Sequence, residues 1–287
     1  MNEKLLSFIL LCTFFLFSYV IFIDFYRSYV IRISTLAYTS IFCIMLISCE
    51  DKKPIPKPKP KHSTAGVVIT FDDTSVDEWS DVDIILKHYS WKATFCVSKI
   101  NTLSHSEIVQ LQKLQKEGHE IAGHGYHHFK APEYVAKYGI DSYINQEINP
   151  MLNLMNFYSL KVTSFAYPYG FRNPEIDSAL LKKFKMIRGT TYTALDPAFQ
   201  YCYFEKNRLV LGLGIDTDYP NFSIPYLIRL LEFAKKKNKI LILYGHKPVE
   251  KVTAKYQTDI ATLIFICNYV HQHKMAFYHL SDLDKLN

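Results

Sequence analysis

The sequence of 287 residues predicts an α/β fold, a distorted (β/α) barrel with about seven parallel strands, preceded by an N-terminal membrane or lipoprotein segment. From residue 66 onward, strand-like and helix-like stretches alternate, which favours a parallel sheet with right-handed crossover connections. Polar residues directly follow several strand-like stretches, at the strand ends where barrels carry their functional sites. No glycine-rich loop follows the first strand, which argues against a dinucleotide-binding fold.

Hydrophobic periodicity and helix-ending residues define the individual elements. In residues 103–116, for example, Ile108, Leu111 and Leu114 recur at helical spacing, and Gly118 follows as a stop signal. Pro150 should break or kink the next helix. The predicted strands cover residues 66–72, 92–97, 119–122, 162–167, 186–189, 209–215, 240–243 and 276–278, and the predicted helices cover residues 76–88, 103–116, 143–158, 174–184, 224–237 and 256–273.

The N-terminal region, residues 1–49, has the pattern of a targeting segment. Residues 5–23 carry no charge and are long enough to cross a bilayer. Arg27 and Arg32 precede a second uncharged run that ends in Leu-Ile-Ser-Cys49, which resembles the lipobox of bacterial lipoproteins, where the cysteine is lipidated and the preceding residues are removed. The first run is then an extra span, or residues 1–30 reflect a start assigned too far upstream. The alternative is two ordinary membrane spans with an incidental cysteine.

Residues 50–65 form a predicted linker rich in lysine and proline, and the folded domain should cover residues 66–287. Alternating Lys and Pro favours an extended polyproline conformation. The formal charge of +6 is concentrated in this segment, which suits a tether near an anionic membrane surface and gives no reason to expect a nucleic-acid partner. We therefore expect a membrane-anchored protein of the cell envelope with its folded domain outside the cytoplasm.

Of the six cysteines, Cys96, Cys202 and Cys267 lie in the predicted domain without the spacing of a zinc ribbon. We expect at most one disulfide, and mostly buried thiols.

The first strand of the domain ends on two adjacent carboxylates, Asp72 and Asp73. Carboxylates delivered by a buried strand need a partner, usually a metal ion or a proton. His124 and His128 are four residues apart, so one helical turn would present both to the same ion. With one carboxylate they would form a His₂Asp set with open positions, as in catalytic sites of zinc and related metals. The second carboxylate could then activate water and His246 could protonate a leaving group, which together describes hydrolysis of an amide or ester.

These motifs resemble those of the polysaccharide deacetylases with a nodulation-protein homology domain, carbohydrate esterase family four, from about Gly66 to Leu283. The resemblance implies that Asp72 is the catalytic base and that Asp73 binds the metal. The segment His124-Gly-Tyr-His-His128 is similar to the second motif, whose outer histidines are metal ligands, although glycine stands at position 125 where serine or threonine is usual. His246 ends a segment similar to the fifth motif and would act as the acid.

Two motifs depart from the family pattern. The third motif usually begins with an arginine that steadies the catalytic aspartate, and here Ala166 stands in its place, followed by Tyr167-Pro-Tyr169. By resemblance, the backbone N–H of Tyr169 would face the oxyanion, with Tyr167 also at the substrate rim. In the fourth motif, Asp216 or Asp218 would hold His246 as an imidazolium, and we favour Asp216 because it follows the strand directly.

The sequence therefore predicts a membrane-tethered, metal-dependent hydrolase that removes acetyl groups, chiefly N-acetyl, from a bacterial surface polysaccharide such as poly-N-acetylglucosamine or peptidoglycan. Zn²⁺ is the expected metal, with Co²⁺, Mn²⁺ or Ni²⁺ as alternatives. Three other functions stay open: a metal-containing carbohydrate-binding lipoprotein without catalysis, motivated by the missing arginine; an amidohydrolase for small ring amides; and a structural envelope lipoprotein.

Overall fold

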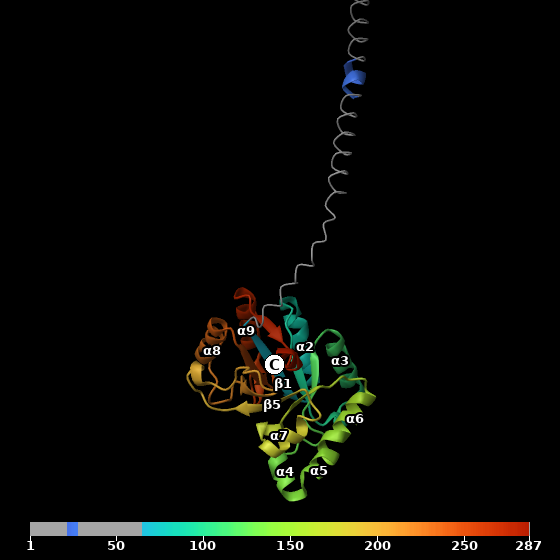
Figure 1. Ribbon diagram of the computed structural model, residues 1–287, viewed down its shortest axis with the longest axis vertical. Helices are drawn as coiled ribbons and strands as arrows, with labels where there is room; N and C mark the ends of the chain where they lie inside the picture. The colour runs from blue at the N-terminus through green and yellow to red at the C-terminus, as the bar shows by residue number, and fades with distance from the viewer. Residues whose placement is uncertain (1–21, 28–64, 287) are drawn as a thin grey trace, which may run out of the picture. The chain divides into compact units, whose positions relative to one another are not determined.

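The computed structural model describes residues 22–27 and 65–286 (Figure 1). The chain divides into two units, residues 1–59 and 60–287. In the first unit, residues 22–27 are helical and exposed. The predicted lipobox cysteine and nearly all of the predicted linker lie outside the described residues, so the anchor stays a prediction. Among the helices that are described, none has the length and apolar character needed to span a bilayer.

The second unit is a closed barrel of seven parallel strands, which confirms the predicted fold class. Each strand pairs with the next along the chain, and β7 pairs with β1 to close the ring. A short strand, β10 (Ala276–Tyr278), pairs with the first residues of β1. The barrel strands are β1 (Gly66–Asp73), β2 (Thr94–Val97), β3 (Glu120–Gly123), β4 (Ser164–Ala166), β5 (Met186–Thr191), β6 (Leu209–Gly214) and β7 (Ile240–Gly245).

Helices surround the barrel (Figure 1), because each crossover packs its apolar side against outward-facing strand residues. Phe95, for example, stacks both with Phe71 of the neighbouring strand and with Trp79 of the first crossover helix in one large core. The helices are α2 (Val76–Leu86), α3 (His105–Lys116), α4 (Ala131–Tyr138), α5 (Ile140–Tyr143), α6 (Asn149–Phe157), α7 (Pro174–Leu180), α8 (Ile224–Lys237) and α9 (Ile260–Gln272).

The predicted helices differ from the structure at three places. The helix predicted over residues 143–158 begins earlier, in α5, and a π-helical turn, η3 (Ile144–Ile148), joins α5 to α6, with Pro150 in the first turn of α6. The helix predicted over residues 256–273 begins only at Ile260, because β9 (Gln257–Asp259) pairs with β8 (Lys247–Val249). Helix α4 was not predicted at all.

The other set of alternating side chains fills the barrel interior. Toward the N-terminal ends of β1, β5, β6 and β7 this interior is apolar, and Leu280 and Leu283 of the C-terminal segment pack into it. The buried carboxylate of Glu120 accepts hydrogen bonds from the Ser164 hydroxyl at 2.7 Å and from the backbone N–H of Ser281 at 2.9 Å. These contacts fix the C-terminal segment as the closed floor of the barrel, and the functional residues gather at the other end.

Candidate active site

The two aspartates at the end of β1 have different surroundings. Asp72 is 3 % exposed and points into the barrel mouth, whereas Asp73 is half-buried and takes a left-handed backbone conformation with φ of 83°. The turn at Asp73 directs consecutive carboxylates to different partners. Asp73 faces His128 and His124, and Asp72 faces Arg188.

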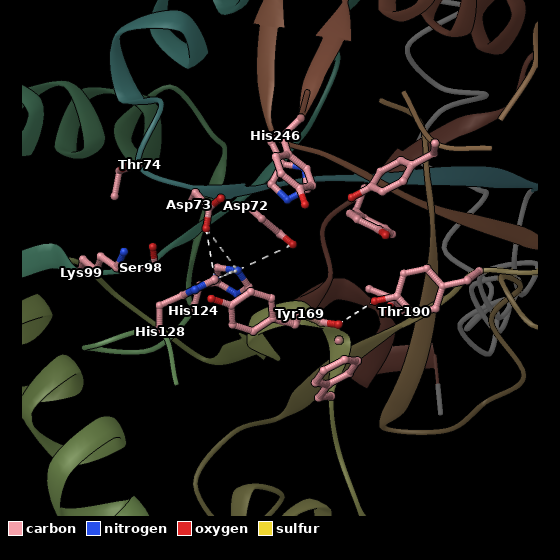
Figure 2. Close-up of a pocket in the computed structure, with 16 residues that line it drawn as sticks. Asp72, Asp73, Thr74, Ser98, Lys99, His124, His128, Tyr169, Thr190 and His246 are labelled. Atoms are coloured by element: carbon pink, nitrogen blue, oxygen red, sulfur yellow. Dashed lines mark hydrogen bonds and ion pairs between the residues drawn. The ribbon is translucent and has the colours of Figure 1, made fainter. Parts of the chain in front are cut away.

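Asp73, His124 and His128 form the one cluster of potential metal ligands found among the described residues (Figure 2). An Asp73 carboxylate oxygen lies 3.2 Å from His128 Nε2 and 3.7 Å from His124 Nε2, and the two Nε2 atoms are 3.2 Å apart. Ligands at tetrahedral positions about 2.1 Å from a zinc ion would be about 3.4 Å from one another. The donor types and their spacing therefore fit a divalent metal such as Zn²⁺.

His124 is prepared as a neutral ligand. Its Nδ1 lies 2.9 Å from the carbonyl oxygen of Ala166, so Nδ1 carries the proton and the Nε2 lone pair faces His128 and Asp73. Burial lowers the pKa of His124 to about 4, so the ring is neutral at pH 7.

The two histidines lie on a loop rather than on the helical turn that their spacing suggested, so that part of the prediction is wrong. Residues 124–130 form neither helix nor strand. Gly125 and His128 both have positive φ, 92° and 67°, which folds the loop back on itself. The fold of this loop, and not a helical turn, brings the Nε2 atoms of His124 and His128 together.

Arg188 of β5 supplies the guanidinium that the third motif lacks, and sequence reasoning missed it. Its Nη2 donates to both carboxylate oxygens of Asp72 at 2.5 Å, and its guanidinium lies over the ring of Tyr244, 4.9 Å from the centroid. Arg188 pairs in register with Ala166, the residue at the usual arginine position. The guanidinium therefore comes from the neighbouring strand, β5. Burial acts to raise the pKa of Asp72, but Arg188, His124 and His246 together outweigh it and hold that pKa below its usual range.

Small inward-facing residues make room for Arg188. Cys96, Ala122 and Ala166 line the interior at this level, and a Cβ on Gly212 would lie 3.2 Å from Arg188 Cδ. An arginine in an otherwise apolar strand, beside a strand carrying only alanine at the matching level, is the sequence signal that could have revealed this pairing.

His246 directly follows β7 and is held by Asp216. Its Nδ1 lies 2.5 Å from Asp216 Oδ2, and Asp216 is fully buried and also accepts from the Thr258 hydroxyl at 2.5 Å. Burial acts to lower the pKa of His246, but the hydrogen bond to Asp216 and the charge of Asp72 outweigh it and raise that pKa. Asp218, the alternative partner, instead accepts from the backbone N–H of Tyr256.

The two tyrosines of the third motif have different places. Tyr169 is half-exposed at the pocket rim and packs against His128, with 4.6 Å between ring centroids. Tyr167 is fully buried, and its hydroxyl donates to Asp177 of α7 at 2.8 Å. The structure therefore places Tyr167 in the core and outside the pocket, against the expectation that it lies at the substrate rim.

These side chains converge on one pocket with a volume of about 550 Å³ (Figure 2). Asp72, Asp73, His124, His128 and His246 line it together with Tyr169. The charged and imidazole groups form one wall, and several aromatic rings form the rim. The arrangement offers a metal-fitting triad, an oriented carboxylate and an imidazole with a raised pKa around one open space.

Residues 59–186 match the family described as polysaccharide deacetylase. This match confirms the predicted resemblance to polysaccharide deacetylases. The matched segment includes both aspartates of β1 and the histidine loop, whereas Arg188 and His246 lie beyond it.

Solved structures show the same fold. The Xyl-CE4 domain of a multidomain xylanase from the hindgut metagenome of Trinervitermes trinervoides superposes with a TM-score of 0.51 at 18% identity, covering 77% of this chain and 90% of that one. A peptidoglycan N-acetylglucosamine deacetylase, solved with 4-naphthalen-1-yl-N-oxidanyl-benzamide, gives a TM-score of 0.50 at 19% identity, covering 77% of this chain and 91% of that one. No curated protein matches the chain.

Proposed function

We propose that this protein is a metal-dependent hydrolase that removes N-acetyl groups from a bacterial cell-surface polysaccharide such as poly-N-acetylglucosamine or peptidoglycan. The observation that carries the proposal is the meeting of three units in one pocket: the metal-fitting triad, the Asp72–Arg188 pair and the His246–Asp216 pair. The family match and the peptidoglycan deacetylase among its structural relatives support the choice of substrate class.

Each unit has a role in the proposed reaction. A divalent metal held by Asp73, His124 and His128 would act as a Lewis acid toward the acetyl carbonyl. Asp72 accepts a proton from the attacking water as the new C–O bond forms, and Arg188 holds the carboxylate in position and ionised. The backbone N–H of Tyr169, at the pocket rim, would stabilise the oxyanion.

The second half of the reaction uses His246. As the C–N bond breaks, His246 gives its proton to the departing amine, and the products are acetate and a glucosamine unit. Asp216 favours the protonated imidazole that this step requires, because its buried carboxylate lies against Nδ1 and leaves Nε2 to face the substrate.

The rim of the pocket suits a carbohydrate polymer. Tyr169, Phe171, Tyr192 and Tyr256 line the pocket and are each among the exposed large hydrophobic residues of the described chain. Exposed apolar rings gathered at a pocket mark ligand-binding grooves, and flat rings with polar tips can pack on the C–H faces of sugars. We infer that neighbouring sugar units of a glycan chain lie across these rings.

We further propose that the enzyme is anchored at the cell envelope through Cys49 or an N-terminal span, with its catalytic domain outside the cytoplasm. The support is the uncharged runs and the lipobox-like segment of the sequence. Incorporation of labelled palmitate into the protein, and its loss in Cys49→Ala, would test the lipid anchor; incorporation that is unchanged in that variant would contradict it.

A binding protein without catalysis is the main alternative. Its motivation was the missing third-motif arginine, and the contact between Arg188 and Asp72 weakens that motivation. The structure offers no separate observation in favour of this alternative.

Acetate release by the purified full-length protein in detergent tests the proposal. Each glycan of an N-acetylated and O-acetylated panel would be assayed after chelation and again after Zn²⁺ is restored. We expect metal-dependent release from an N-acetylated glycan, and loss of release in Asp72→Asn with metal binding retained. Glycan binding without acetate release from any substrate would favour the binding protein.

A further inference from the structure

We propose that Glu147 is a positioning residue that shapes the metal-holding loop, residues 124–130, and thereby sets the place of His128. The inference rests on the proposed function, because it concerns the same metal site. Glu147 lies in η3, on a different segment of the chain from every proposed ligand.

The carboxylate of Glu147 holds the loop by its backbone. One oxygen accepts from the N–H of His127 at 2.7 Å, and the other accepts from the N–H of Phe129 at 3.0 Å. These two N–H groups flank His128 on either side. The main chain on both sides of this ligand is therefore tied to one buried side chain.

The loop needs such an acceptor because its residues form neither helix nor strand. Buried N–H groups outside regular structure must find partners elsewhere. A carboxylate offers two oxygens and accepts stronger bonds than a neutral group does. Glu147 itself is fully buried, so these bonds and a contact of 3.2 Å to Nδ1 of His127 also compensate the burial of its charge.

Gly125 is the structural complement of Glu147. A Cβ at position 125 would lie 2.4 Å from Oε1 of Glu147, and the φ of 92° disfavours any other residue. The carboxylate thus occupies the space that a side chain at position 125 would need. The unusual glycine of the second motif is explained by a loop held from outside by Glu147.

The π-helical turn places this carboxylate. Hydrogen bonds in a π-turn span one residue more than in an α-helix, which shifts the side chains that follow around the helix axis. Glu147 belongs to that turn, and its own carbonyl accepts from the N–H of Tyr126 at 3.3 Å. Main chain and side chain of the same residue therefore hold the loop at three points.

The test compares metal binding in Glu147→Ala and Glu147→Gln with wild type and one control variant, using the full-length protein. The control, Glu133→Gln, removes an exposed carboxylate that pairs with Lys130. Zn²⁺ affinity is measured by competition with a chromophoric chelator, and the ligand geometry by the visible spectrum of the Co²⁺ form. Thermal unfolding of each metal-free variant is recorded in parallel.

We expect Glu147→Ala to bind Zn²⁺ about 10- to 100-fold more weakly, as for other outer-shell partners of metal ligands. Glu147→Gln should lose affinity to a smaller extent, because an amide oxygen can replace only one of the two acceptors. Both variants should change the Co²⁺ spectrum, and the control Glu133→Gln should retain wild-type affinity and spectrum.

Unchanged affinity and spectrum in folded Glu147→Ala and Glu147→Gln would overturn the inference. Lower thermal stability with unchanged metal binding below the unfolding transition would also overturn it, because the role would then be structural only. A wild-type protein that binds no metal would instead refute the proposed metal site itself, and the role of Glu147 with it.

Discussion

Replacing Arg188 with methionine tests the displaced arginine directly. Arg188 is fully buried, Asp72 is 3 % exposed, and Nη2 is the donor to both carboxylate oxygens. Removing one partner of a buried ion pair leaves an uncompensated charge, which destabilises a protein by about 3–5 kcal/mol. Since domains are typically stable by about 5–15 kcal/mol, the variant should fold but unfold at clearly lower denaturant concentration.

A double-mutant cycle separates the lost ion pair from the lost packing. Asp72→Asn removes the buried charge while conserving side-chain volume, so Asp72→Asn combined with Arg188→Met leaves no orphaned ion. The double variant should be more stable than the sum of the single effects predicts, with a coupling energy of about 1–3 kcal/mol. The measurement is urea unfolding of metal-free protein at pH 7, because a bound metal would partly compensate the carboxylate.

The same substitution should reduce catalysis, because the carboxylate of Asp72 loses the contact that orients it. A misplacement of about 1 Å at a reacting group can reduce the rate about 100-fold. We expect such a loss in kcat/KM for acetate release, with Zn²⁺ affinity close to wild type. Additive free energies of unfolding in the double-mutant cycle, together with normal acetate release by Arg188→Met, would refute the proposal that Arg188 holds and orients Asp72.

Three further changes test other parts of the site. Chelation of the metal should abolish acetate release, and Zn²⁺ should restore it; release that survives exhaustive chelation would contradict a metal-dependent reaction. Asp216→Asn should lower the pKa of His246, because the carboxylate that counteracts the effect of burial is removed. The alkaline limb of the kcat/KM–pH profile should therefore move to lower pH. An alkaline limb at the wild-type pH would argue against His246 as the acid. Tyr167→Phe should reduce the free energy of unfolding by about 1 kcal/mol through the lost hydrogen bond to Asp177, with acetate release unchanged; a large loss of activity would return Tyr167 to the site.

The strand-end residues could be predicted because their sequence order follows the fold directly. A buried strand that ends in Asp72-Asp73, and another that ends in His246, deliver polar groups to the same end of a parallel barrel. Periodicity alone was sufficient to place these residues together. The contact between an aspartate and His246 was implied by the resemblance to the fourth motif, and the strand end favoured Asp216 over Asp218, because Asp216 comes two residues after the end of β6.

Two features could not be predicted, for different physical reasons. The path of the histidine loop depends on two residues with positive φ and on Glu147, which is some twenty positions away in the sequence. The role of Arg188 depends on which side of β5 faces the barrel interior and on the register between β4 and β5. A one-residue change of register would have placed the arginine among the outer helices, and the sequence of one strand does not specify that register.

The direction of β1 places the N-terminal end of the domain and the pocket at opposite ends of the barrel. The chain that precedes the barrel joins at Gly66, the first residue of β1, whereas the pocket opens around Asp72 and Asp73 at the last residues of the same strand. Eight extended residues span about 26 Å. Gly66 therefore lies at the pole of the barrel opposite the pocket, separated by the length of β1 from the carboxylates that would meet a polymer substrate.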